Sequence, residues 1–301
     1  MSSKDCNNDS GKLYDLRDFR AIRRIDRDSY YTIRLIKNTK TGEKFAAKEY
    51  KTDDNPKYLP SNEWNVYMKL KHPTIVSYIG HSIINFDGER KSTTITEYIP
   101  RSLEKILLRR RETELTNTNK YIILLGIAIS LKYIHSQGVI YRNIRPKSIL
   151  LDDQFYPRIW CFELSYTTDK ELTETEMNDR FGTFPYMAPE YFSEGSSYSY
   201  KIDVYSFAII MYQVMTCEVV DYASSDWICR ITDIIDGVRP DINLVQSKKM
   251  RDLIERCWSS DPSTRPNFIE IVEEMKSEEL QREFGANQEE ISAYLDYLST
   301  H

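Results

Sequence analysis

The chain has 301 residues, of which 41% are apolar and 29% are charged, and its formal net charge is −5. This length fits one large domain or two medium ones, and the composition is ordinary for a soluble globular protein. The acidic balance gives no support for binding to nucleic acid or to an anionic membrane surface. The longest apolar stretch, 121–129, is too short to span a bilayer and is typical of a buried helix, and the polar start is unlike a signal peptide. We therefore expect a cytoplasmic protein whose five cysteines are reduced and mostly buried.

The first third of the chain has the alternation of polar and apolar residues that is typical of strands. Residues 1–17 are predicted to form a flexible tail. Strands are predicted at 30–38 and, after a short turn, at 45–50. A helix capped by its first residue is predicted at 61–71, and a further strand at 92–99.

The remainder of the chain is mainly helical in pattern. A long apolar helix is predicted at 117–135, and two short apolar runs at 148–151 and 158–162 indicate a hairpin. The last stretch, from Glu278, is acidic and helix-prone, and it either packs on the body of the protein or forms a solvated tail. Strands followed by helices predict two lobes of unlike class. The other segments with helical periodicity are 204–215, 227–235, 248–258 and 268–275.

Several short motifs occur in a characteristic order. They are Ala-Ala-Lys at 46–48 with Glu63 on the next helix, Thr-Glu-Tyr-Ile at 96–99, Tyr-Arg-Asn-Ile-Arg-Pro-Lys-Ser at 141–148, Cys-Phe-Glu at 161–163, a Phe-Gly-Thr to Ala-Pro-Glu segment at 181–190, Asp-Val-Tyr-Ser-Phe at 203–207, and Cys-Trp with Asp-Pro-Ser-Thr-Arg-Pro at 257–266. Together they resemble the eukaryotic protein kinase family over residues 18–276. The last two motifs are most similar to the tyrosine-kinase-like and tyrosine kinase branches.

The resemblance implies a bilobal α+β fold. A small N-lobe, residues 18–100, would hold an antiparallel sheet and one main helix, and a large C-lobe, residues 101–276, would be mainly helical. A C-terminal helical extension would cover 277–301. The resemblance also implies an adenine pocket, in which 96–99 form the gatekeeper and hinge. The residues assigned to nucleotide binding in this way are Ile33, Ala46, Lys48, Glu63, Thr96, Glu97, Ile99 and Leu150.

The phosphate-binding loop of the family is degraded in this chain. Its three glycine positions fall on Asp26, Asp28 and Tyr31. Glycine lets backbone N–H groups approach phosphates closely, and side chains prevent this approach. The two carboxylates also repel a triphosphate, unless they simply point into water. No cofactor is therefore required, and at most a weak, metal-independent adenine nucleotide is expected.

The remaining chemical groups are also replaced. Ser148 and Cys161 stand at the metal-ligand positions, and because Mg²⁺ prefers oxygen ligands, no metal site is expected. Glu163 can supply a carboxylate nearby, but it is expected at the surface. Asn143 stands at the catalytic base position and cannot accept a proton as a carboxylate does. Arg145, at the phosphate-lysine position, keeps the charge but not the geometry.

The positions that preserve the shape of the family are retained. Lys48 and Glu63 are expected to pair and to fix the first helix on the sheet. Arg142 either grips a phosphate on one of the activation-segment threonines (Thr167, Thr168, Thr173 and Thr175) or lies beside an unmodified loop. The structural positions implied by the resemblance are Tyr67, Tyr141 and Phe162 in an apolar stack, Asp203 beneath the catalytic loop, and the pair Glu190 and Arg265.

Retained shape with replaced chemistry predicts a catalytically inactive kinase-like domain, a pseudokinase. It would act in signalling by allosteric control or by binding a protein partner, such as an active kinase or its substrate, and not nucleic acid or the membrane interior. Candidate partner surfaces are the helix that carries Glu63, the activation segment and the C-terminal extension. Two alternatives remain: a residual, slow ATP-dependent kinase for Ser/Thr or Tyr, and a nucleotide-sensing binding module.

Overall fold

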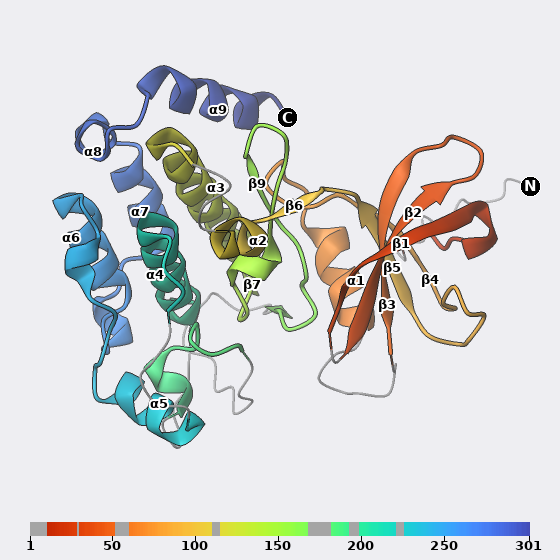
Figure 1. Ribbon diagram of the computed structural model, residues 1–301, viewed down its shortest axis with the longest axis horizontal. Coiled ribbons are helices and arrows are strands. Elements are labelled where there is room, and N and C mark those ends of the chain that lie inside the picture. The colour runs from red at the N-terminus through yellow and green to blue at the C-terminus, as the bar shows by residue number, and fades with distance from the viewer. Residues whose placement is uncertain are drawn as a thin grey trace, which may run out of the picture. The chain divides into compact units, whose positions relative to one another are not determined.

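The computed structural model describes residues 11–28, 30–51, 60–109, 115–167, 182–192, 199–220 and 226–301. The chain divides into two compact units, one formed by the residues up to Lys71 together with Val76–Ile99, and the other by His72–Ile75 and Pro100–His301. The smaller unit contains a five-stranded antiparallel sheet, and the larger unit is mainly helical (Figure 1). This confirms the predicted α+β fold.

The smaller unit is a sheet with strand order β1-β2-β3-β5-β4 and one helix. The strands predicted at 30–38, 45–50 and 92–99 are present as β2, β3 and β5. The bounds are β1 (Phe19–Arg27), β2 (Tyr31–Asn38), β3 (Lys44–Tyr50), α1 (Pro60–Lys69), β4 (Tyr78–Ser82) and β5 (Thr93–Glu97). The sequence analysis missed β1 because this edge strand has two irregularities in its register and exposes most of its residues, so it lacks a period of two.

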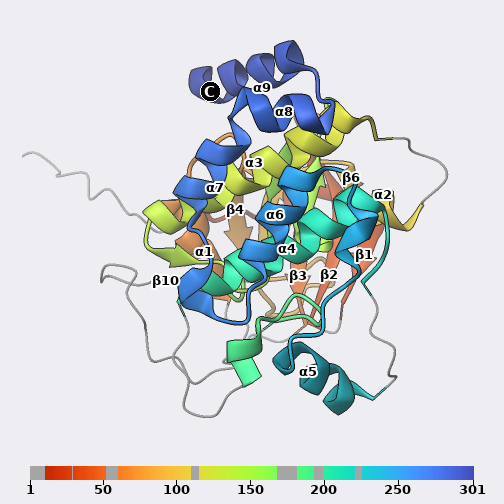
Figure 2. The same cartoon turned by 90° about the vertical axis from the view of Figure 1, so that its left-hand side faces the viewer.

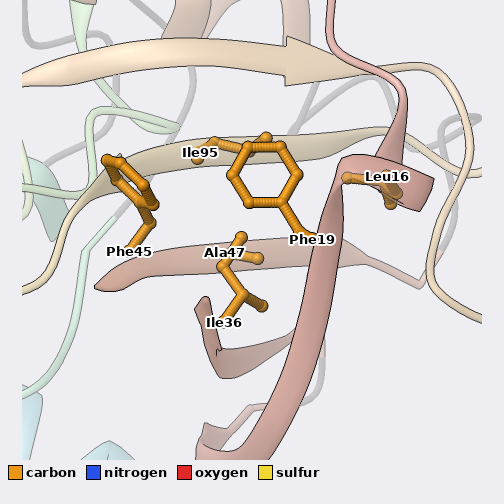
Figure 3. Packing of buried hydrophobic residues seen from close by; sticks show 6 residues of the cluster. All are labelled: Leu16, Phe19, Ile36, Phe45, Ala47 and Ile95. Atoms are coloured by element: carbon orange, nitrogen blue, oxygen red, sulfur yellow. The ribbon is translucent and has the colours of Figure 1, made fainter. Parts of the chain in front are cut away.

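One face of this sheet is closed by an apolar cluster. Phe19 and Phe45 meet edge to face, with ring centroids 5.9 Å apart. The cluster consists of Leu16, Phe19, Ile36, Phe45, Ala47 and Ile95 (Figure 3). Leu16 belongs to a short 3₁₀ turn (Leu16–Asp18), and the backbone N–H of Tyr14 donates to the carbonyl of His81 at 2.7 Å.

Two expectations for the smaller unit are corrected by these contacts. Residues 11–17 are tied to the sheet and are not a flexible tail, because Leu16 supplies apolar surface to the core. Residues 1–10 of the expected tail lie outside the described residues. Helix α1 begins at Pro60, so Ser61 lies inside the first turn and does not cap the helix. Proline suits the first helical position because it has no N–H group that needs a partner.

The larger unit is organised around one buried helix. Helix α3 buries all residues from Tyr121 to Ala128, as expected for the apolar stretch, and contacts α4, α7, α8 and α9 (Figure 2). The helices are α2 (Leu103–Leu108), α3 (Asn117–Ser136), α4 (Lys201–Thr216), α5 (Trp227–Ile235), α6 (Lys248–Cys257), α7 (Phe268–Met275), α8 (Glu278–Phe284) and α9 (Gln288–Thr300). Short strands accompany them: β6 (Arg101–Ser102), β8 (Ile149–Leu151) and β9 (Pro157–Ile159) form one sheet, and β7 (Val139–Ile140) pairs with β10 (Tyr166–Thr167).

The helices and thiols of the described residues test two further expectations. Within the described residues, every helix is too short or too polar to cross a bilayer. Cys161 and Cys257 are buried, Cys217 is half-buried and Cys229 is exposed. The expectation of mostly buried thiols therefore holds for only half of these four, and Cys6 lies outside the described residues.

The C-terminal stretch packs on the body of the larger unit. Helices α8 and α9 lie along one side of α3 in both views (Figures 1 and 2). The rings of Tyr121 and Phe284 meet edge to face at 5.0 Å, and Asn117 Nδ2 donates to the carbonyl of Phe284 at 3.1 Å. The backbone N–H of Asn287 donates to Thr118 Oγ1 at 3.0 Å. These contacts exclude the alternative of a solvated tail.

Tyr294 is the main anchor of α9. Its side chain is fully buried, and its ring centroid lies 4.5 Å from that of Tyr156. A Cβ atom on Gly126 of α3 would stand only 2.3 Å from the Tyr294 hydroxyl oxygen, so the glycine makes room for the phenol. Among the described residues, no group forms a hydrogen bond with that hydroxyl. Burial also raises the pKa of the Tyr294 phenol far above its usual range, which keeps it neutral.

Two substitutions at Tyr294 should therefore behave in opposite ways. Tyr294→Ala removes a buried ring and should lower the free energy of unfolding by about 3–5 kcal/mol. Tyr294→Phe removes only an unsatisfied buried hydroxyl and should be neutral or stabilising by up to about 1 kcal/mol. Urea denaturation of both variants measures this. A clear loss of stability in Tyr294→Phe would show that the hydroxyl has a partner.

Candidate functional site

Four of the residues assigned to nucleotide binding share one face of the sheet in the smaller unit. Ile33 on β2 is directly opposite Lys48 on β3, and Ala46 on β3 is directly opposite Thr96 on β5. Directly opposed residues point to the same face, and alternate residues of one strand do so as well. Ile33, Lys48 and Thr96 are buried, and Ala46 is half-buried. The structure thus brings these four together.

The expected pair between Lys48 and Glu63 is formed and fully desolvated. Lys48 Nζ lies 2.9 Å from Glu63 Oε1, and the two side chains are 5% and 0% exposed. Glu63 also accepts hydrogen bonds from the hydroxyls of Tyr50 and Thr94, the latter at 3.3 Å. Trp64 Nε1 donates to the same Thr94 hydroxyl at 2.8 Å. This network fixes α1 to β3 and β5.

Two tyrosine rings complete the surroundings of Lys48. Its ammonium lies 4.7 Å from the ring centroid of Tyr31 and 5.1 Å from that of Tyr50, distances at which cation–π attraction acts. Both tyrosines are 2% exposed. From the sequence, Tyr31 was predicted only as a replaced loop glycine, and no role was predicted for Tyr50. The strand register identifies both tyrosines as neighbours of Lys48. Tyr31 is directly opposite Tyr50, and Tyr50 lies two residues after Lys48 on the same face of the sheet.

The turn that replaces the phosphate loop is a closed hairpin. The N–H of Asp28 donates to the carbonyl of Tyr31 at 2.9 Å, and the N–H of Lys51 donates to the carbonyl of Tyr30 at 2.9 Å. The ammonium of Lys51 in addition donates to the carbonyl of Asp28. Asp26 and Asp28 are half-buried, so neither points freely into water. Lys51, which the sequence analysis did not single out, ties the hairpin to the end of β3.

Three further residues assigned to nucleotide binding are Glu97 and Ile99, at the end of the smaller unit, and Leu150, in the larger unit. The N–H of Glu97 donates to the carbonyl of Ser77 at 3.0 Å, and Glu97 Oε1 accepts from the N–H of Ser77 at 2.6 Å. Ile99 is buried in the smaller unit, whereas Leu150 is a half-buried residue of β8 in the larger unit. Glu97 is thus held by its own unit through both backbone and side chain.

In the larger unit, Asp203 holds the loop at the catalytic-loop position. Its carboxylate accepts the backbone N–H groups of Tyr141 and Arg142 at 2.9 and 2.8 Å. His135 Nε2 lies 2.8 Å from the same carboxylate. Arg142 has a φ of +66°, a conformation that non-glycine residues seldom adopt. Two charge-assisted hydrogen bonds from one buried carboxylate hold the backbone in this conformation.

The base and metal positions of this loop are occupied by local hydrogen bonds. Asn143 is buried, and its Oδ1 accepts from the hydroxyl of Thr183 at 3.1 Å. The hydroxyl of Ser148 donates to the carbonyl of Arg145 at 2.8 Å and accepts from the Arg145 N–H at 3.1 Å. Ser148 therefore closes the loop on itself, and Asn143 joins the loop to the segment that contains Thr183.

The expectation that Glu163 lies at the surface is wrong. Glu163 is 4% exposed and Cys161 is 5% exposed. The thiol of Cys161 donates to Glu163 Oε1 at 3.3 Å, so the carboxylate has a polar partner within the segment. Cys161 has a φ of +77°, and a turn at this residue lets a side chain two positions further on fold back onto the thiol. The carboxylate is thus directed at the thiol that stands at a metal-ligand position.

The comparisons with known proteins agree with this arrangement. The family model described as protein kinase domain matches residues 19–275. The chain belongs to the protein kinase family. It is 28% identical over 84% of its length to the probable serine/threonine-protein kinase gdt2 of Dictyostelium discoideum, of which it covers 14%. It is 25% identical over 79% of its length to the serine/threonine-protein kinase STY17 of Arabidopsis thaliana, of which it covers 40%. It is 30% identical over 68% of its length to the serine/threonine/tyrosine-protein kinase HT1 of the same organism, of which it covers 50%.

Two residues assigned to the apolar stack of the kinase fold meet in the larger unit. The rings of Tyr141 and Phe162 pack edge to face at 5.3 Å, and the hydroxyl of Tyr141 donates to the carbonyl of Cys161 at 3.1 Å. Burial raises the pKa of the Tyr141 phenol well above its ordinary value, so it remains a donor. The third residue, Tyr67, is buried in the smaller unit and stacks on Tyr78 at 5.6 Å.

Arg142 is engaged within its own unit. Its Nε donates to the carbonyl of Leu164 at 2.5 Å, and its guanidinium lies 5.7 Å from the ring centroid of Tyr166. Thr167 is exposed and pairs with Val139 in the two-stranded β7–β10 sheet. The other three candidate threonines, Thr168, Thr173 and Thr175, lie outside the described residues.

The pair between Glu190 and Arg265 is bidentate and buried. The two nitrogen–oxygen distances are 2.6 and 2.8 Å, and Arg265 is 1% exposed. Arg265 also donates to the carbonyls of Ser259 and Lys201 at 2.9 and 3.0 Å. Four of its five N–H donors thus join Glu190, the start of α4 and the residues after α6, a structural role for this kinase-fold pair.

The desolvation of Lys48 and Glu63 generates a stability prediction. Lys48→Met leaves a buried carboxylate without its cation and should cost about 3–5 kcal/mol of unfolding free energy. Adding Glu63→Gln removes that charge while keeping an acceptor for Tyr50, so the double variant should be more stable than Lys48→Met alone. Denaturant unfolding of the four proteins in this cycle gives the coupling energy.

The exposed pair between Arg282 and Glu278, 2.7 Å apart on α8, is a matched control. Arg282→Met should change the stability little, because exposed pairs are screened by solvent. If Lys48→Met is equally mild, the buried pair is not a structural requirement of the smaller unit.

Proposed function

We propose that this protein kinase domain is a pseudokinase that acts in signalling by allosteric control or by binding a protein partner, such as an active kinase or its substrate. The proposal includes a cytoplasmic location, the tyrosine-kinase-like branch and no required cofactor or metal. The observation that carries it is the enclosure of Lys48 by Glu63, Tyr31 and Tyr50. In a kinase this lysine must face the phosphates of ATP.

The enclosure works against phosphate binding in two ways. Active kinases keep the carboxylate partner of this lysine, but here two ring faces also lie against the ammonium, so a phosphate would have to displace one of the rings. Tyr31 stands where the family has its third loop glycine, and its ring lies 4.7 Å from the ammonium of Lys48. A buried Tyr that must leave its site exposes a large apolar area, which costs free energy.

The larger unit supports the same proposal. Phosphoryl transfer depends on positioning and on charge neutralisation by metal ions. Asn143 offers an amide that is bonded to Thr183, and Ser148 closes its own loop. Cys161 offers a thiol, a soft group that suits Mg²⁺ poorly. A residual kinase would need substitutes for the base and for both metal ligands at once.

A nucleotide-sensing module is a second candidate, favoured by one observation. Ile33, Ala46 and Thr96 lie on one sheet face and form an apolar wall with a single hydroxyl. Such a wall suits the flat ring of adenine and needs neither phosphate nor metal. The ligand proposed here is accordingly a weakly bound adenine nucleotide, recognised through its base.

Thermal shift with adenosine, ATP, and ATP with Mg²⁺ tests the proposal. A ligand at one hundred times its dissociation constant stabilises the protein by about 2.7 kcal/mol, which is readily seen. We expect equal shifts with adenosine and ATP, and no further shift on adding Mg²⁺. A largest shift with Mg²⁺ and ATP would contradict the proposed loss of the phosphate site.

Tyr31 itself can be tested with three variants. Tyr31→Gly should restore access to Lys48 and raise the affinity for ATP relative to adenosine by about tenfold, because one phosphate–ammonium contact is gained. Tyr31→Phe keeps the ring and should behave as the parent protein. Tyr30→Gly makes the same change one position away and should not improve ATP binding. Isothermal titration calorimetry gives the three affinities.

Phosphotransfer is expected to be absent, and restoring one group should not create it. Asn143→Asp supplies a carboxylate at the base position but leaves the metal positions and Lys48 unchanged. Radiolabelled ATP with generic Ser/Thr and Tyr substrates should give no signal above background for either protein. A signal from the parent protein that Lys48→Met abolishes would instead establish a residual kinase.

A further inference from the structure

Four arginines on β1 form a basic edge on the smaller unit. Arg20, Arg23, Arg24 and Arg27 occupy four of the nine positions of this strand, and all four are exposed. Strand β1 is an edge of the sheet. Within the described part of the chain, no side-chain hydrogen bond or ion pair engages any of these guanidinium groups. In a chain with a net charge of −5, an edge strand of this kind is unusual in its local charge.

The register distributes these arginines over both faces of the sheet. Arg20 and Arg23 are opposite Lys37 and Leu35, whereas Arg24 and Arg27 are opposite Arg34 and Thr32. Lys37 and Leu35 are alternate residues of one strand and share a face, and Arg34 and Thr32 share the other. Two arginines therefore flank the edge on each face. From Arg20 to Arg27 they extend over roughly 23 Å of strand.

The arrangement is unfavourable for the isolated sheet. Arg20 is directly opposite Lys37, and Arg24 is directly opposite Arg34, and like charges in directly opposed positions destabilise a strand pair. Arg34 is compensated by Glu49 at 2.5 Å and by Asp87 at 3.6 Å. Lys37 has no ion pair among the described residues. A bound anion would relieve this repulsion.

We propose that the β1 edge binds an extended, acidic polypeptide segment of a protein partner. Such a segment places its own side chains alternately on two faces, so carboxylates on each face can meet the arginines of that face. Guanidinium groups match carboxylates with two parallel hydrogen bonds. This proposal is independent of the nucleotide pocket. The β1 edge would bind an acidic segment whether the domain is a pseudokinase or an active kinase.

The two-face arrangement favours a polypeptide over a membrane or a duplex. A flat anionic surface laid on one face of the sheet meets only two of the four arginines. The register irregularities between Ala21 and Arg23 and between Arg24 and Asp26 also interrupt a regular edge. Recognition is therefore assigned to the side chains, with Ile22, which is 42% exposed, as an apolar contact, and not to a continuous backbone ladder.

Two peptides of equal composition test the arrangement. In Thr-Glu-Thr-Glu-Glu-Thr-Glu-Thr the carboxylates follow the register positions of the arginines, which are opposite Lys37, Leu35, Arg34 and Thr32, and two lie on each face. In Glu-Thr-Glu-Thr-Glu-Thr-Glu-Thr all four carboxylates lie on one face. At low ionic strength we expect the first to bind with a Kd of about 0.1–1 mM and the second about fivefold more weakly. NMR titration of the full chain measures both, and affinity should fall as salt rises.

Paired substitutions locate the binding. Arg20→Gln with Arg23→Gln, and Arg24→Gln with Arg27→Gln, should each weaken binding of the first peptide about five- to tenfold. Lys105→Gln with Lys248→Gln removes two exposed charges from the larger unit and should have no such effect. The thermal midpoints of the arginine variants should be unchanged or higher, since like-charge repulsion is reduced.

Several results would overturn the proposal. The two peptides could bind with equal affinity, or only one of the two arginine pairs could affect binding. Vesicles with 20% phosphatidylserine or a 20-base-pair DNA duplex could bind more tightly than the first peptide. Finally, none of the probes could bind. If an arginine variant failed to fold, the comparison of the two peptides on the parent chain would still decide. None of these outcomes bears on the thermal-shift test of the nucleotide pocket.

Discussion

The smaller unit depends on one buried ion pair, that of Lys48 with Glu63. Neither charge reaches water, so each must be satisfied by the protein itself. Glu63 is satisfied by Lys48, Tyr50 and Thr94, and Lys48 by Glu63 and two rings. These partners come from β2, β3, β5 and α1, and the pair therefore ties together most of the unit.

The fold was predictable where side chains follow a regular period. Helix α3 and strands β2, β3 and β5 have such periods, and the motif order supplied the rest of the architecture. Strand β1 was not predicted, because two irregularities break its register and its solvent-facing positions hold arginines. The anchoring of residues 11–17 could not be foreseen from their polarity, since it depends on Leu16 reaching a core formed by distant strands.

The candidate site was predictable in its positions and in its two buried ion pairs, Lys48 with Glu63 and Glu190 with Arg265, but not in its other contacts. The resemblance identified Asn143, Ser148 and Cys161 as replacements, but it did not indicate their hydrogen-bond partners, which are Thr183, Arg145 and Glu163. Glu163 was expected at the surface as part of an altered activation segment, whereas it is buried beside Cys161, which has a positive φ. Such outcomes depend on backbone turns and strand register, which link residues that pattern analysis treats separately.

The exchange of glycine for Tyr31 has two consequences that support each other. It removes the backbone approach on which a phosphate loop relies, and it gives the ammonium of Lys48 a ring face within a desolvated site. An active kinase must leave its lysine accessible and accept the cost to stability, and a domain without that task can fill the space. The same hairpin carries the arginines of β1 on its outer strand. This hairpin therefore borders a buried ammonium on β3 and carries exposed guanidinium groups on β1.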